Sequence, residues 1–205
     1  MFKGLLKGNS KMANKISWVV GGLIIIAFLI YLISPFSGNN VPSEFTNARA
    51  LASVHAQEVV GLLEETSNNL SKIKELENSY QWKEALNVTY KEINKYNVLR
   101  DKALDLTSQL EIMAKSVPDI SPRQARELAL VAISSEVTLV TTLNNYINGD
   151  LSVLLELLRQ RLLGRGSDYN SLNKIVDNMN AKKESINNLN NQFSQLMGEF
   201  DKNYQ

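Results

Sequence analysis

Few side chains in this 205-residue sequence could catalyse a reaction or hold a metal ion, and the nearest to a reactive pair is His55 with Glu58. A spacing of three residues places both on one face of a helix, where they could contact one ion. A bundle that binds two metal ions through carboxylates needs two Glu-x-x-His pairs, and this chain has one histidine. The lack of cysteine excludes disulfides, cysteine-bound zinc, iron–sulfur clusters and thiol nucleophiles. We therefore expect no metal site and no cofactor, and a structural place for His55 at a helix seam or its boundary.

The other motifs that could carry chemistry are weak or missing. Glu64 and Glu65 are adjacent acids without a second partner in sequence, a pattern typical of a solvated helix face. Residues 69–71 (Asn-Leu-Ser) and 87–89 (Asn-Val-Thr) match the N-glycosylation pattern, yet both fall inside predicted helices. The sequence has no glycine-rich phosphate loop, no Gly-x-Ser-x-Gly turn and no acidic calcium loop. We therefore expect no catalytic residue and a protein that is not an enzyme.

Composition narrows the partners and the fold class. The chain has 22 Lys and Arg against 21 Asp and Glu, so it lacks the basic excess of nucleic-acid-binding proteins, and no nucleic acid is expected. Its 10 glycines and 4 prolines indicate long uninterrupted elements rather than a turn-rich β fold. The length suits one ordinary domain, or one small domain with an appendage.

A long apolar segment near the N-terminus predicts a membrane-spanning helix. From Ile16 to Ile33 the chain reads ISWVVGGLIIIAFLIYLI, 18 residues without a charge. As a helix this segment would be ~27 Å long, close to the ~30 Å hydrocarbon core of a bilayer. Trp18 and Tyr31 lie near its two ends, where amphipathic rings favour the lipid headgroups. The lipid bilayer is therefore the first expected partner.

The charges that flank this segment predict its orientation. Four lysines and no acid occur in residues 1–15, whereas the first charge after the segment is Glu44. The positive-inside rule then makes residues 1–15 a basic cytoplasmic tail and places everything after Pro35 outside. A cleaved signal peptide is the alternative, but the apolar run exceeds the usual ~7–15 residues and no Ala-x-Ala-like site follows it. We expect an uncleaved signal anchor that crosses the cytoplasmic (plasma) membrane once, with the N-terminus in and the C-terminus out.

The rest of the chain has the pattern of long packed helices. Residues 34–42 (SPFSGNNVP) contain two of the four prolines and form a linker that ends the membrane helix. Across residues 43–205 the apolar residues recur at steps of three and four, which is the spacing of one helix face, and four mid-stripe residues are expected in the core: Leu106, Leu110, Leu189 and Phe193. The sequence therefore predicts an all-α protein with a single N-terminal transmembrane helix and an antiparallel extracytoplasmic bundle of three to four long helices.

Proline and glycine mark the clearest breaks within the bundle. Residues 118–122 (Pro-Asp-Ile-Ser-Pro) form one break, after which Ser121 would cap a helix whose first residue is Pro122. Residues 164–166 (Gly-Arg-Gly) end that third helix, and Ser or Asp at 167–168 would cap the fourth.

Three other places are less regular. Asn78 and Gln81 are spaced as a cap pair around a turn between the first two helices, although a single bent helix is the alternative. Residues 148–150 (Asn-Gly-Asp) are a second place where the third helix could divide. Residues 137–142 are β-branched enough for a strand, but their helical flanks favour helix.

The third helix is apolar on two sides, which gives it two interpretations. Either it is the central helix that all the others cover, or its second side packs on another protein chain, a partner or a second copy. Three arginines also cluster at its C-terminus, where they complement the helix dipole. The predicted partner contacts are the residues of the second side with these arginines: Leu130, Ile133, Val137, Val153, Leu157, Arg159, Arg161 and Arg165.

These patterns favour a membrane-anchored, non-enzymatic scaffold or adaptor that presents a helical bundle to a protein partner. The alternative is a sensory or ligand-binding domain, which a single span and a tail of about 15 residues make less suitable for signalling. A third interpretation is an accessory subunit of an envelope enzyme or transport complex. A polar, ligand-sized cavity would favour sensing, whereas a packed core with an exposed apolar stripe would favour assembly. A small-molecule ligand is not expected.

Overall fold

The computed structural model describes residues 41–165 and 169–204. The predicted membrane helix with Ile16, Trp18, Tyr31 and Ile33, the basic tail and most of the linker lie outside the described residues and stay predictions. The described part is helical and contains no strand, with these elements in chain order: α2 (Ser43–Asn78), α3 (Trp82–Ser116), the 3-10 turn η3 (Val117–Asp119), α4 (Arg123–Asn145), the π-helical turn η4 (Tyr146–Leu151), α5 (Ser152–Leu162) and α6 (Tyr169–Tyr204). The predicted helical bundle is therefore confirmed.

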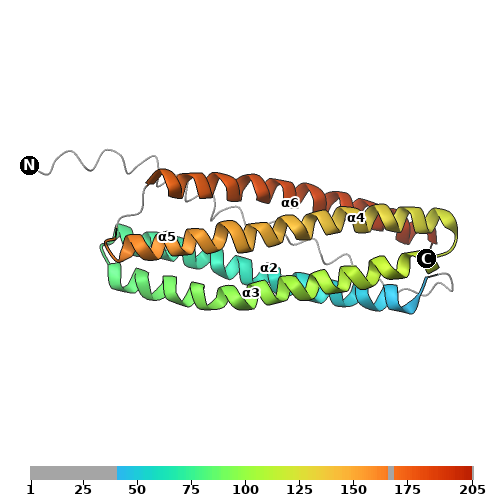
Figure 1. Cartoon of the computed structure of the whole chain (residues 1–205), viewed down its shortest axis with the longest axis horizontal. Coiled ribbons are helices and arrows are strands. Elements are labelled where there is room, and N and C mark those ends of the chain that lie inside the picture. The colour runs from blue at the N-terminus through green and yellow to red at the C-terminus, as the bar shows by residue number, and fades with distance from the viewer. Residues whose placement is uncertain (1–40, 166–168, 205) are drawn as a thin grey trace, which may run out of the picture.

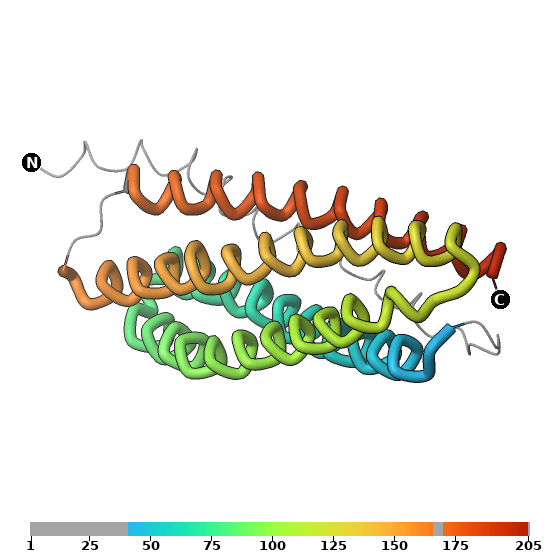
Figure 2. Tube along the Cα trace, turned by 45° about the vertical axis from the view of Figure 1, so that its right-hand side comes forward, coloured from blue at the N-terminus to red at the C-terminus, as the bar shows by residue number. Residues whose placement is uncertain are grey.

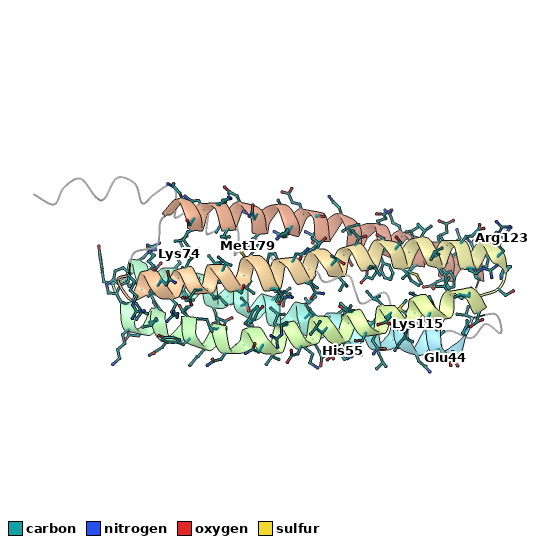
Figure 3. All side chains as sticks on the ribbon, in the orientation of Figure 1. Glu44, His55, Lys74, Lys115, Arg123 and Met179 are labelled. Atoms are coloured by element: carbon teal, nitrogen blue, oxygen red, sulfur yellow. The ribbon has the colours of Figure 1, made fainter. Side chains whose placement is uncertain are left out.

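The helices run antiparallel as four rods, because α4, η4 and α5 join into one (Figure 1). The start of α2, residues 117–122 and the end of α6 lie together at one end of the bundle, called the near end, where Figure 3 labels Glu44 and Arg123. Residues 79–81 and 163–165 lie at the far end, close to the labelled Lys74. The first two helices are separate, joined by a turn at 79–81, so the alternative of one bent helix is wrong.

The four helical rods do not all contact one another to the same extent. α2 packs chiefly on α3 and α4 packs chiefly on α6, while α3 joins the two pairs by contacting both α4 and α5 (Figure 2). The predicted stripes form the shared core: Leu106, Leu110 and Phe193 are buried, whereas Leu189 is partly buried at the margin.

Two predicted helix caps are not formed. The third helix begins at Arg123, and Pro122 is the N-cap because its ψ of 178° is extended rather than helical; its carbonyl accepts the first helical bond, from Arg126. The prediction of Ser121 as the cap was therefore wrong by one position. Gln81 precedes α3 without a side-chain cap bond, so Asn78 and Gln81 do not act as a cap pair. The predicted caps at 167–168 lie outside the described residues.

The third rod stays continuous where the sequence suggested a division. Residues 148–150 lie inside the π-helical turn η4, and residues 137–142 are helical as predicted. Among the described residues, one helix, Arg123–Leu162, is long and apolar enough by composition to cross a membrane. Its contacts with α3 and α6 account for that apolarity, because a helix covered on two sides needs two apolar sides.

Candidate interaction surface

Between Glu127 and Glu156, the rod of α4, η4 and α5 turns its charged side chains inward. The acids within this interval, Glu136 and Asp150, are 1% and 5% exposed. Every exposed residue in the interval is uncharged, and these ten residues are called the α4 face: Leu130, Val131, Ser134, Val137, Thr138, Thr141, Asn145, Asn148, Gly149 and Val153. A surface helix ordinarily carries its charges on the outer side. The α4 face reverses that polarity.

Three of the predicted partner contacts lie on this face. Leu130, Val137 and Val153 are 56%, 46% and 42% exposed. Leu157 is partly buried, and Ile133 is buried in the core. Another helix of the same chain therefore covers Ile133: it lies seven residues before Val140, which is also buried, so the inner arc of α4 is wider than the spacing suggested.

Val131 belongs to the α4 face although the two-sided apolar pattern did not include it. It lies half-exposed beside Leu130. The signal that could have found it is its spacing of seven residues from Thr138 and of fourteen from Asn145, which places all three on one line along the helix.

The hydroxyl groups of the two threonines on the α4 face bond to their own helix. Thr138 Oγ1 donates to the carbonyl of Ser134 at 2.9 Å, and Thr141 Oγ1 donates to that of Val137 at 2.8 Å. These threonines therefore present methyl groups without a free hydroxyl donor, so covering them with another apolar surface leaves no donor unpaired.

The three predicted arginines do not act as one cluster. Arg159 donates two hydrogen bonds to Glu156, at 2.8 and 2.6 Å, and with a bond from Gln160 these hold the pKa of Glu156 at about 2. Arg161 Nε lies 3.3 Å from Glu77 Oε1 of α2, where burial raises the pKa of Glu77 and Arg161 opposes that rise. Arg165 is exposed. Two of the arginines are thus committed to contacts within the chain.

The two inward acids are accommodated differently. Asp150 pairs with Lys182 of α6, whose Nζ lies 2.6 Å from Asp150 Oδ2. Glu136 Oε2 has no hydrogen-bond partner among the described residues, and burial raises the pKa of Glu136 to about 8. Glu136 is therefore largely protonated at neutral pH. Both acids are buried in the bundle, so neither adds a charge to the α4 face.

His55 lies at the seam of α2 and α3, as predicted (Figure 3). Its Nδ1 is 3.1 Å from Glu58 Oε2 and 4.0 Å from Asp105 Oδ2. Lys102 Nζ lies 2.9 Å from the same Glu58 oxygen, and the hydrogen bonds from Lys102 and then His55 lower the pKa of Glu58. Glu58 is therefore shared between His55 of its own helix and Lys102 of α3. Across residues 41–165 and 169–204, no group of three or more His, Asp and Glu side chains is placed to hold a metal ion.

Comparison with known proteins gives no relative: no family model, curated protein or solved structure matches this chain. Its function is inferred below from the placement of its own residues.

Proposed function

We propose that this protein is a membrane-anchored, non-enzymatic interaction module whose α4 face binds another protein. The partner that we propose is a second copy of the same chain. The observation that carries the proposal is the reversed polarity of α4, with Glu136 and Asp150 inside and ten uncharged residues outside. Charged residues are depleted in the cores of protein interfaces because their desolvation is costly. From Leu130 to Val153 the face extends ~35 Å, which suits a helix-on-helix contact.

The anchor in this proposal is residues 16–33, which carry no charge. The start of α2 and the end of α6 both lie at the near end of the bundle (Figure 1), so that end would face the cytoplasmic membrane from outside. The far end would then stand ~50 Å away, the length of a 36-residue helix such as α2. The sensory and accessory-subunit interpretations draw no specific support from the contacts of the described residues.

Disulfide cross-linking in native membranes tests the α4 face directly, because the chain has no cysteine of its own. With Val137→Cys in the full chain, mild oxidation should give an adduct of about twice the 23.0 kDa mass. The matched control is Glu64→Cys on the exposed side of α2, which should stay monomeric. Heavier adducts with another protein would support an adaptor instead of a homo-oligomer. Equal yields at the two positions, or no adduct at Val137→Cys and Leu130→Cys, would contradict use of this face.

A separate test concerns the anchor. The full chain should resist alkaline extraction from membranes, and deletion of residues 17–33 should release the remainder in soluble form. Residues 43–205 carry 18 cations and 21 anions, so electrostatic attraction to anionic lipid would not retain them. A reporter fused after Gln205 should lie outside the cytoplasm. A cytoplasmic reporter would show that the orientation drawn from the lysines is wrong.

A further inference from the structure

α2 ends at the far end in a Schellman motif whose central residue is Tyr80. The N–H of Gln81 donates to the carbonyl of Leu76 at 2.8 Å, and the N–H of Tyr80 donates to that of Glu77 at 3.0 Å. This pair of bonds requires the residue after the C-cap Ser79 to adopt a left-handed conformation. That residue is Tyr80, and its φ is 60°. Glycine ordinarily takes this position, because a Cβ crowds the neighbouring carbonyl oxygen there.

α5 ends at the same end of the bundle in the same motif, with glycine in the central position. The N–H of Arg165 donates to the carbonyl of Gln160, and the N–H of Gly164 donates to that of Arg161, both at 3.0 Å. Gly164 has a φ of 70°. The two turns therefore form an internal comparison, in which the same backbone carries glycine once and a large aromatic residue once.

The strain at Tyr80 is not offset by burial within the described chain. The side chain is 75% exposed, although a bulky residue in a strained conformation is usually held by close packing. Its ring contacts Trp82 edge to face, with centroids 6.1 Å apart and planes at 77°, and Trp82 is itself 45% exposed. The chain thus holds two neighbouring aromatic rings in water at a cost in backbone energy. Backbone strain of this kind concentrates where it serves binding.

The charges around these rings indicate the kind of partner. The described residues 71–92, 156–165 and 169–174, which include both turns, carry eight Lys and Arg against five Asp and Glu, whereas the other described residues from 43 to 204 carry ten against fifteen. The far end is therefore the positive end of a negative bundle. Among the described residues of this end, two acids are exposed, Glu75 and Glu84, against five exposed cations: Lys72, Lys83, Lys91, Arg165 and Lys174. The acids Glu77 and Glu156 are paired with arginines. An acidic partner would complement this surface.

Protein is the class of partner that these side chains fit. Tyr, Trp and Arg are the residues most enriched among those that dominate protein–protein binding energy. A nucleic acid would meet five acids interspersed among the eight cations, which weakens phosphate binding. We propose that the far end is a contact site at which Tyr80 and Trp82 enter an apolar pocket of an acidic partner protein, with Lys83 and Arg165 against carboxylates at its rim. This site is separate from the α4 face and does not rest on it.

The first arm of the test measures whether Tyr80 costs stability. In the full chain, Tyr80→Gly should raise the midpoint of thermal unfolding, because glycine accepts the left-handed conformation. The matched control is Gly164→Ala, which should lower the midpoint at the equivalent position of the α5 motif. If Tyr80→Gly lowers the midpoint instead, Tyr80 serves the fold and the proposal is overturned.

The second arm identifies the partner and its dependence on charge. A photoreactive phenylalanine analogue replaces Tyr80 in the full chain in cells, with the same analogue at Val98, an exposed site on α3, as the control. We expect one protein adduct at position 80 alone. The captured protein is then purified, and its Kd should rise by ~10-fold or more for Tyr80→Gly or Trp82→Ala and become less salt-sensitive for Arg165→Glu. Unchanged affinity in these variants, adducts only with lipid or nucleic acid, or no adduct would each overturn the proposal.

Discussion

Arg49 of α2 and Asp201 of α6 form two parallel hydrogen bonds, of 2.7 and 2.8 Å, between residues 152 positions apart in the chain. Arg49 is buried and Asp201 is partly buried. Beside them the rings of Phe45 and Phe200 approach to a centroid distance of 6.1 Å. α2 and α6 make few other close contacts, so this group of residues ties the first and last rods together at the near end.

Breaking this pair should destabilise the bundle strongly. Asp201→Ala leaves the Arg49 charge in a buried position, and the expected loss in the free energy of unfolding is ~3–5 kcal/mol. Arg49→Met should cost less, because an apolar side chain then fills much of the same volume. Urea denaturation of both variants measures this, with Lys202→Ala, an exposed neighbour, as the control. Equal small losses in all three would contradict a buried ionic contact.

The apolar stripes make a second prediction. Leu106→Ala, in the core of α3, should lower the free energy of unfolding by ~2–5 kcal/mol through lost burial and a residual cavity. Lys91→Ala, on the exposed side of the same helix, should change it by no more than ~0.5 kcal/mol. Chemical denaturation compares them. Similar losses at the two sites would mean that the stripe does not form the packed core.

The rods and their order follow from the sequence, because long apolar stripes and proline or glycine breaks act locally. The stripe through Leu106 and Leu110 needed no knowledge of tertiary contacts. The breaks predicted at 78–81, with one bent helix as the alternative, and at 164–166 lie at the observed turns, 79–81 and 163–165. The Arg49–Asp201 pair could not be found in this way. Arg49 is a charged residue in a helix, and its burial depends on a contact with Asp201, 152 positions away in the chain.

The α4 face could be predicted only in part, because the burial of some of its neighbours also depends on tertiary contacts. A two-sided apolar pattern in the third helix correctly indicated that Leu130, Val137 and Val153 are not all covered by one seam. The pattern could not show whether Ile133 is buried or exposed, because that depends on how closely α3 and α6 approach α4. The strained aromatic turn at Tyr80 gave no sequence signal, because a tyrosine in a Schellman motif is recognised only from its φ.

The π-helical turn makes a third prediction, by deletion. A π-helical turn is an α-helix with an extra residue, so removing exposed Gly149 should restore an α-helical turn and keep the register of α4 and α5. Removing Thr138 from the middle of α4 would instead rotate every following side chain by about 100° and expose the core. Circular dichroism and thermal unfolding should show a cooperative helical protein after the first deletion and not after the second. Equal damage from both would mean that the side chains held at this turn require the extra residue.

The buried Glu136 makes the last prediction, a dependence of stability on pH. Its pKa is about 8 in the folded chain because of burial, against an ordinary value of 4.5. Between these values the unfolded chain loses the proton while the folded chain keeps it, so stability falls as pH rises from about 4.5 to about 8 and levels off above that. At ~1.4 kcal/mol per pH unit, the full loss approaches ~5 kcal/mol. Glu136→Gln, which keeps the shape and carries no charge, should abolish this slope and leave the variant more stable than the wild type at pH 8. Urea denaturation at pH 5, 6.5 and 8 measures it, with exposed Glu64→Gln as the control. Parallel stability curves for Glu136→Gln and the wild type would show that Glu136 is already ionised in the folded chain at neutral pH.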